Sequence, residues 1–182
     1  MKLENIEEIF ESAVQNHKKN NFKIAEKLYK KILSVNPDHF RSIFLLGSLS
    51  AQIKNLDSAK QLLQKAIKIN PNYAEAHNNL GMVFRELKES QKAISCYEKA
   101  IQINPNYVLA YNNLGKVFGE LNEFNKSANY YEKALKLDPN RKETCGGYGN
   151  LLLKFNQHSK ALSYIKKSTG FISFTQKDFK II

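Results

Sequence analysis

The sequence predicts an all-α protein, an α-solenoid in which one helical hairpin is repeated along the chain. Three sets of residues, each spaced by 34 positions, support this fold class. The four prolines are Pro37, Pro71, Pro105 and Pro139. Four of the eight glycines are Gly47, Gly81, Gly115 and Gly149. The third set, of large and mostly aromatic residues, is Tyr29, Leu63, Tyr97, Tyr131 and Ile165. Because unrelated residue types share one period, the repeated unit is a piece of structure.

Within one period the apolar residues follow two separate helical stripes. The first stripe comprises Ala76, Leu80, Val83, Phe84 and Leu87. The second comprises Ala93, Ile94, Tyr97, Ala100 and Ile101. The segment 88–90 between them predicts a short turn, and Asn72 with Glu75 has the spacing of a capping box before the first helix. Asn104 precedes Pro105, which disfavours helical backbone at Asn104 and predicts the end of the second helix.

Small residues recur where the two helices of a pair are expected to face each other. A glycine inside a helix costs about 1 kcal/mol relative to alanine, so a periodic glycine indicates a steric requirement. We therefore expect Gly81 on the first helix and Ala93 on the second to let the two helices pack closely.

The repeated unit resembles the tetratricopeptide repeat (TPR). The resemblance rests on NNLGMVF and AISCYEKAIQINP at 78–84 and 93–105, and on NNLGKVF and SANYYEKALKLDP at 112–118 and 127–139. It implies units at 6–39, 40–73, 74–107, 108–141 and 142–175, the last one incomplete. It also implies a right-handed superhelix of antiparallel helix pairs, in which the first helices line a concave groove and the second helices form the convex back.

The resemblance is incomplete at two places, and it ends in an unusual tail. The fourth position of a unit often holds tryptophan in this family, but here it holds Ile43, His77, Tyr111 or Cys145. The fifth unit lacks the closing proline, since Ser173 stands there. We expect the TPR array to occupy residues 1–168 and an apolar C-terminal tail to occupy 169–182. The tail either caps the last unit, which we favour, or docks a partner or a second copy of the chain.

Composition argues against several classes of protein. No apolar run approaches the roughly 18 residues of a membrane helix, and the start MKLENIEEIF is unlike a secretory signal, so we expect a cytoplasmic protein. Cys96 and Cys145 form no CxxC pair, which disfavours disulfides and zinc. The net charge of +11 comes from 25 lysines and three arginines spread along the chain, as on solvated helix faces. This disfavours nucleic acid as a partner, and RNA or an anionic surface bound by a lysine-rich convex face stays an alternative.

The sequence shows no pattern of an enzyme, a metal site or a cofactor site, and we expect no cofactor. The histidines His17, His39, His77 and His158 lack the spacing of metal ligands. The glycines of 145–149 follow no strand and fall inside a predicted helix, so they are not expected to bind phosphate. His77 and Cys145 fall on core positions, which predicts a buried imidazole and a packed thiol.

The resemblance also implies which side chains face the concave groove. The candidate peptide-binding residues are Arg41, Phe44, Ser48, Asn78, Asn79, Met82, Arg85, Asn112, Asn113, Lys116 and Asn150. Asn79 and Asn113 stand one repeat apart, and a side-chain amide can pair with a peptide backbone, as in the asparagine ladder of O-linked GlcNAc transferases. The alternative is that these amides only bond to neighbouring helices. The Lys/Asn/Arg pattern of the carboxylate clamp in chaperone-binding TPRs is not reproduced, which disfavours a C-terminal carboxylate as ligand.

The sequence therefore predicts a non-enzymatic interaction module. Its partner would be an extended or helical segment of another protein, bound in the concave groove. One alternative is the substrate-recruiting TPR portion of a glycosyltransferase, a sulfotransferase or a 2-oxoglutarate oxygenase whose catalytic domain lies elsewhere.

Overall fold

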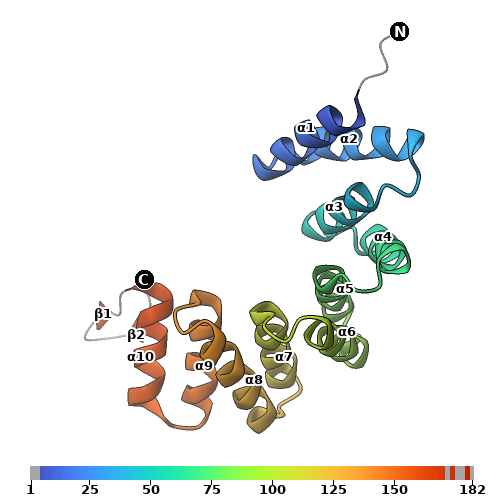
Figure 1. The fold of residues 1–182 in the computed structure, drawn as a ribbon. Helices are drawn as coiled ribbons and strands as arrows, with labels where there is room; N and C mark the ends of the chain where they lie inside the picture. The colour runs from blue at the N-terminus through green and yellow to red at the C-terminus, as the bar shows by residue number, and fades with distance from the viewer. Residues whose placement is uncertain (1–4, 171–172, 175–178, 181–182) are drawn as a thin grey trace. The chain divides into compact units, whose positions relative to one another are not determined.

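The computed structural model describes residues 5–170, 173–174 and 179–180, and these residues form ten helices and two short strands (Figure 1). The chain divides into two compact units, 1–96 and 97–182, with the boundary inside helix α6. Unit 1 contains α1 (Ile6–Lys18), α2 (Phe22–Val35), α3 (Phe40–Gln52), α4 (Leu56–Ile69), α5 (Ala74–Glu86) and the start of α6 (Ser90–Ile103). Unit 2 contains the end of α6, α7 (Val108–Glu120), α8 (Phe124–Leu137), α9 (Lys142–Lys154), α10 (His158–Thr169), β1 (Ser173–Phe174) and β2 (Phe179–Lys180). The predicted all-α solenoid of helix pairs is confirmed.

The helices follow the sequence period. The first helices of the pairs begin at Ile6, Phe40, Ala74, Val108 and Lys142, and the second helices begin at Phe22, Leu56, Ser90, Phe124 and His158. Each set advances by 34 residues, as the prolines and glycines do. Helix α6 ends at Ile103, directly before the predicted stop at Asn104.

The loop before each first helix differs from the prediction. Asn72 does not cap α5, because the N-cap residue is Tyr73 and no side chain bonds to the helix start there. Asn72 instead donates its backbone N–H to Oδ1 of Asn70 (3.2 Å). Asn106 bonds in the same way to Oδ1 of Asn104 (3.0 Å). The residue before each of these prolines therefore shapes a local turn around the proline, which is what short polar side chains do in place of capping.

The turn inside each helix pair also repeats. Its central residue has a left-handed backbone, with φ between 58° and 63°, at Asn20, Lys54, Lys88, Asn122 and Asn156. The N–H that follows it bonds back across the end of the first helix, as from Glu89 to the carbonyl of Phe84 (2.9 Å). This is the Schellman arrangement, which satisfies the last carbonyl groups of a helix. The sequence alone does not predict this turn, because two of the five residues are lysines, which rarely adopt this conformation.

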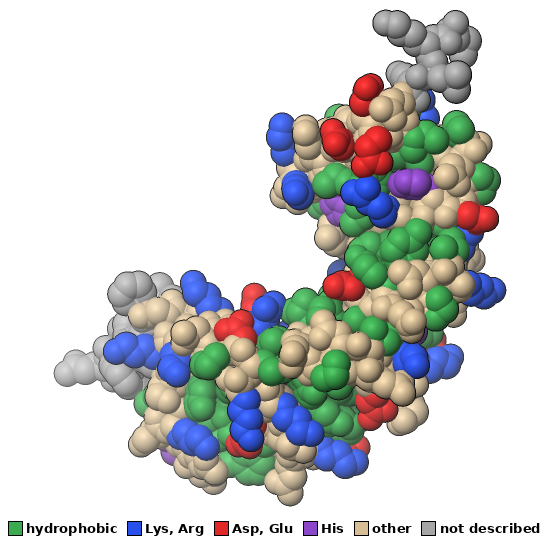
Figure 2. Space-filling view, in the orientation of Figure 1, with side chains coloured by type: hydrophobic (Ala, Val, Ile, Leu, Met, Phe, Trp, Pro, Cys, Tyr) green, Lys and Arg blue, Asp and Glu red, His purple; other side chains and the backbone are tan. Residues whose placement is uncertain are grey.

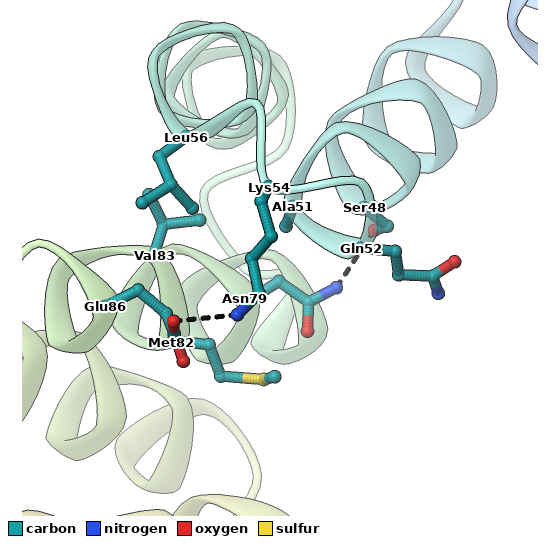
Figure 3. A pocket seen from close by; sticks show the side chains of 9 residues that line it. All are labelled: Ser48, Ala51, Gln52, Lys54, Leu56, Asn79, Met82, Val83 and Glu86. Atoms are coloured by element: carbon teal, nitrogen blue, oxygen red, sulfur yellow. Dashed lines mark hydrogen bonds and ion pairs between the residues drawn. The ribbon is translucent and has the colours of Figure 1, made fainter.

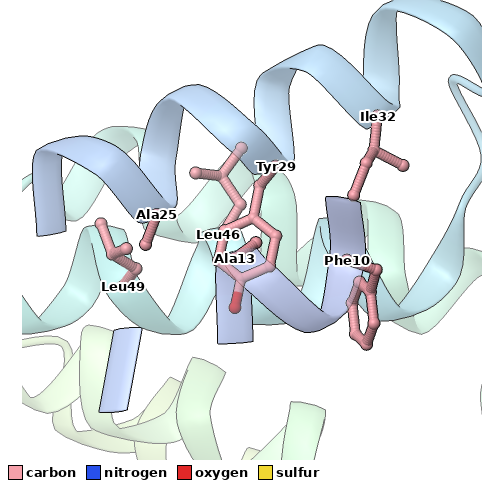
Figure 4. Close-up of a cluster of buried hydrophobic side chains, with 7 residues drawn as sticks. All are labelled: Phe10, Ala13, Ala25, Tyr29, Ile32, Leu46 and Leu49. Carbon is pink, nitrogen blue, oxygen red and sulfur yellow. The ribbon is translucent and has the colours of Figure 1, made fainter. Parts of the chain in front are cut away.

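Each unit has a core between its helices. Figure 4 shows one in unit 1, built from Phe10, Ala13, Ala25, Tyr29, Ile32, Leu46 and Leu49. In unit 2 the corresponding cluster is Tyr131, Leu135, Cys145, Tyr148, Leu151, Leu152 and Ala161. Two of the periodic glycines are needed for close packing: a Cβ at Gly115 would lie 2.8 Å from the Tyr131 ring, and one at Gly149 would lie 2.7 Å from Ile165. Gly81 and Ala93 are both buried, as expected for close packing.

The last helix ends at Gly170, whose φ of 82° is the left-handed conformation expected of a glycine stop. Strands β1 and β2 pair antiparallel, with Ser173 opposite Lys180, and this pairing differs from the all-helical prediction. The expectation that the apolar tail caps the fifth repeat or associates with another copy concerns side chains outside the described residues, and it stays a prediction. None of the described helices has the length and hydropathy required to cross a membrane.

Candidate functional site

Unit 1 contains a hollow of about 250 Å³ between α3, the α3–α4 turn and α5, here named the α3/α5 pocket (Figure 3). Its lining residues are Ser48, Ala51, Gln52, Lys54, Leu56, Asn79, Met82, Val83 and Glu86. Three of the candidate peptide-binding residues, Ser48, Asn79 and Met82, are therefore brought together. Lys54 was not a candidate, because it lies in the turn after α3 rather than on a first helix.

In the lining of the pocket, a hydrogen bond joins the two first helices α3 and α5. Asn79 on α5 donates through Nδ2 to Oγ of Ser48 on α3 (2.9 Å), and its Oδ1 accepts from Nδ2 of Asn78 (3.3 Å). Asn79 thus bonds to a neighbouring helix, and its contact with a peptide stays a prediction. An amide has two N–H groups and two lone pairs on its oxygen, so these bonds use half of its capacity.

The lining of the pocket also contains an ion pair between Lys54 and Glu86. Lys54 Nζ lies 2.7 Å from a carboxylate oxygen of Glu86, so the pair joins the α3–α4 turn to the end of α5. The hydrogen bond from Lys54 lowers the pKa of Glu86, so the Glu86 carboxyl group is ionised at physiological pH. Val83, Leu56 and Met82 supply the apolar part of the lining, and Met82 is 42% exposed. The pocket therefore combines an apolar surface with fixed polar groups.

A second hollow of unit 1, of about 190 Å³, is aromatic and is here named the aromatic pocket. Phe40 and Phe44 of α3 both meet Tyr73 edge to face, at centroid distances of 5.0 and 4.9 Å. Arg41 lies over the Phe10 ring at 4.1 Å and bonds to Glu7 at 3.0 Å. The candidates Arg41 and Phe44 thus share one pocket. Phe40 and Tyr73 were missed, and the spacing of Phe40 and Phe44 by one helical turn is the sequence signal that points to Phe40.

Unit 2 contains a hollow of about 330 Å³ between α7, α8 and α9, here named the α7/α9 pocket. Its lining residues are Lys116, Gly119, Glu120, Ser127, Tyr131, Gly147, Asn150, Leu151 and Lys154. It includes the candidates Lys116 and Asn150. Tyr131 and Ser127 come from the second helix α8 and were assigned to the core by the sequence period, which is why neither was a candidate.

The remaining candidates do not line these pockets. Asn78, Asn112 and Asn113 are 2%, 2% and 6% exposed, respectively. Their burial favours a role in helix packing over direct contact with a ligand. The Oδ1 of Asn112 accepts no hydrogen bond from the described residues. Arg85 is partly exposed and lies 3.6 Å from Glu86.

The titratable core residues behave as inert packing groups. The prediction of a buried imidazole at His77 is confirmed: 9% of the residue is exposed, and its Nε2 lies 2.9 Å from the carbonyl oxygen of Pro71. The predicted packed thiol of Cys145 is fully buried. Burial raises the pKa of Cys145, and it raises the pKa of Cys96 to about 11, so both thiols are protonated at neutral pH. Among the described residues, no three His, Cys, Asp or Glu side chains are placed to share a metal ion. Lysine and arginine side chains are dispersed over the face that Figure 2 shows.

Comparison with solved structures finds chains of the same fold. Two structures of MamA are 28% and 26% identical to this chain, with TM-scores of 0.73 for both; they cover 86% and 91% of this chain, and the matches span 91% and 90% of the MamA chains. PilF of Pseudomonas aeruginosa is 20% identical with a TM-score of 0.82, and the match covers 93% of this chain and 78% of PilF. A thermophilic TPR protein of Thermus thermophilus is 19% identical with a TM-score of 0.78, over 91% of each chain. No protein of curated function matches the sequence.

Comparison with protein families gives the same result. The tetratricopeptide repeat model matches residues 74–107 and 108–141, and a second TPR repeat model matches residues 47–87. This fold is that of a scaffold for protein–protein interaction, whose stacked helix pairs present extended binding surfaces. The two models together span residues 47–141, more than half of the chain, and the chain belongs to the tetratricopeptide repeat family.

Proposed function

We propose that this protein is a non-enzymatic interaction module and that unit 1 binds a peptide segment of another protein on its first helices. The observation that carries the proposal is the α3/α5 pocket. Met82, which is exposed, lines this pocket together with the Ser48–Asn79 hydrogen bond and the Lys54–Glu86 ion pair. An apolar hollow with a few fixed polar groups at its edge is the usual form of a site for one peptide side chain.

The spacing of the two pockets on α3 supports an extended segment. Phe44 belongs to the aromatic pocket and Ser48 to the α3/α5 pocket, and the two residues are one turn apart on α3. A helix rises about 1.5 Å per residue, which separates them by about 6 Å along the axis. An extended chain advances about 3.3 Å per residue, so its alternate side chains, which point the same way, are about 6.6 Å apart. Two alternate side chains of a segment that runs along α3 therefore have about the spacing of Phe44 and Ser48. The free cysteines Cys96 and Cys145 favour a reducing compartment such as the cytoplasm for this interaction.

A displayed library of random dodecapeptides tests the proposal. Peptides enriched on the wild-type protein should bind about tenfold or more weakly to Met82→Lys, because a charge replaces the apolar side chain in the pocket. Leu137→Lys is the matched control, since Leu137 is 41% exposed against 42% for Met82, lies on the second helix α8 and undergoes the same change. Circular dichroism confirms that both variants fold. Equal affinities of the two variants for the enriched peptides would contradict the proposal.

A further inference from the structure

The α7/α9 pocket of unit 2 occupies the same place in its repeats as the α3/α5 pocket does in unit 1. Seven of the nine residues that line each pocket correspond one to one after a shift of 68 positions, which is two repeats. The pairs are Ser48 and Lys116, Ala51 and Gly119, Gln52 and Glu120, Asn79 and Gly147, Met82 and Asn150, Val83 and Leu151, and Glu86 and Lys154. The two units therefore carry versions of one site, and the differences between the versions indicate a different ligand group.

The first difference is charge. Where the α3/α5 pocket has Ser48 and Glu86, the α7/α9 pocket has Lys116 and Lys154. Where the α3/α5 pocket has Gln52, the α7/α9 pocket has Glu120. The α3/α5 pocket contains Lys54 and Glu86 and is neutral overall. The α7/α9 pocket contains two lysines and one glutamate, so its side chains carry one net positive charge.

The second difference is polarity and space. Met82, an exposed apolar residue, is replaced by the polar Asn150, which removes the apolar anchor of the pocket. Asn79 is replaced by Gly147, and a Cβ at that position would lie 2.7 Å from the Tyr131 hydroxyl oxygen. The phenol of Tyr131 thus approaches the backbone of α9, and its hydroxyl group lies where the unit 1 pocket has a side-chain amide. The hollow is larger, about 330 Å³ against about 250 Å³.

The position of Lys154 is set by an aromatic ring. Its Nζ lies 4.7 Å from the centroid of Phe124, the first residue of α8. An ammonium group over an aromatic face is attracted to the ring, which restricts the rotamers of the side chain. Less side-chain entropy is then lost when a ligand binds, which makes this lysine a better anchor than one that moves freely in solvent.

We propose that the α7/α9 pocket binds the carboxylate of an aspartate or glutamate side chain in a peptide segment of the partner protein. Lys116 and Lys154 supply the positive charge, and the amide of Asn150 supplies a hydrogen-bond donor. Glu120 limits the net charge of the pocket, which suits a single carboxylate rather than a doubly charged phosphoryl group. This inference rests on the proposed function, because it extends peptide binding to unit 2 and names the group that is recognised there.

The dodecapeptide library also tests this inference when each peptide is fused to its carrier through the C-terminus, so that any carboxylate comes from a side chain. Peptides enriched on the wild-type protein should share an aspartate or glutamate at one position. Synthetic, C-terminally amidated copies in which that residue is changed to asparagine or glutamine should bind about tenfold more weakly. A Lys116→Gln/Lys154→Gln variant should bind the acidic peptides about tenfold more weakly and should no longer distinguish them from their amide counterparts.

Lys133→Gln/Lys136→Gln is the matched control, because both lysines are exposed on α8 and the change in net charge is identical. This control should keep the preference for the acidic peptides. Equal losses in the two double variants would overturn the inference, since the effect would then be one of overall charge. Binding only by peptides with a free C-terminal carboxylate would overturn it as well.

The outcomes separate this inference from the proposed function. Enriched peptides that lack a shared acidic residue, yet bind weakly to Met82→Lys, would overturn the inference and support the proposed function. Peptides that respond to the unit 2 lysines and not to Met82→Lys would support the inference and contradict peptide binding by unit 1. A library from which the wild-type protein enriches no peptide would contradict both.

Discussion

The imidazole Nε2 of His77 lies 2.9 Å from the carbonyl oxygen of Pro71, six residues earlier in the chain. The carbonyl can only accept, so Nε2 carries the proton. Two repeats later, the thiol of Cys145 is directed to the carbonyl oxygen of Pro139 at 3.6 Å. Both residues stand at the fourth position of their 34-residue repeat, where tryptophan is frequent in this family. In these two repeats the side chain at that position joins the first helix to the loop before it.

His77→Ala is therefore expected to lower the free energy of unfolding by about 2 to 3 kcal/mol, because it removes a buried hydrogen bond and leaves a cavity in unit 1. Urea titration followed by circular dichroism measures the change. His158→Ala is the control, since His158 is exposed at the start of α10 and its replacement should cost less than about 0.5 kcal/mol. Equal losses in the two variants would show that the bond to Pro71 does not stabilise the fold.

Two glycines of α7 should respond differently to alanine. A Cβ at Gly115 would lie 2.8 Å from the Tyr131 ring, whereas one at Gly119 would meet only Ser127 Oγ, at 3.3 Å. Gly115→Ala should cost about 1 to 3 kcal/mol through overpacking, despite the better helix propensity of alanine. Gly119→Ala should cost far less or stabilise the protein. Thermal melts of the two variants decide this, and a similar loss in melting temperature for both would contradict the steric interpretation of the periodic glycine.

The sequence period predicts the helices well and the turns poorly. The starts of the first and second helices follow directly from the 34-residue spacing, because every repeat must bury the same faces against its neighbours. Asn72 was wrongly expected to cap α5, since the proline turn uses the neighbouring Asn70 instead. The left-handed turn residues were missed because nothing in the local sequence marks Lys54 or Lys88 as unusual.

The sequence also predicts the pocket residues on the first helices better than those that come from a turn or a second helix. Positions on the first helices repeat, so Ser48, Met82 and Lys116 could be placed in a groove from the period and the family resemblance alone. Lys54 enters its pocket from a turn, and Tyr131 enters its pocket because Gly147 leaves room for the phenol. Both depend on contacts that a turn or a second helix makes with the neighbouring repeat, which a one-dimensional period does not contain.

The backbone strain at Lys88, which has a left-handed conformation, can be relieved by substitution with glycine. A residue with a Cβ costs about 1 to 2 kcal/mol in this conformation, and glycine avoids that cost. Lys88→Gly should therefore raise the free energy of unfolding by about 1 kcal/mol, less a contribution from the greater freedom of glycine in the unfolded chain. Gln64→Gly, on an exposed position inside α4, should lower the free energy of unfolding by about 1 kcal/mol. A lower free energy of unfolding in both variants would contradict the role of backbone strain at Lys88.

Alkaline pH should destabilise unit 1 through Tyr29. The residue is fully buried beside His17, and burial raises its pKa to about 12 from the ordinary value of 10.0. Below pH 10 the phenol is neutral in both the folded and the unfolded chain, so its full contribution to stability is present. Between pH 10 and 12 the unfolded chain releases the proton and the folded chain does not, so stability falls as the pH rises.

Tyr29→Phe removes this titration and keeps most of the packing. Its free energy of unfolding should decrease less than that of the wild type between pH 9 and pH 11, by about 1 kcal/mol. Urea titrations of both proteins at the two pH values give the four free energies required, and the comparison at pH 9 serves as the control for any packing cost of the substitution. The titration of exposed lysines affects both proteins equally and cancels in the difference. Parallel losses of stability in the two proteins would show that Tyr29 does not govern the alkaline transition.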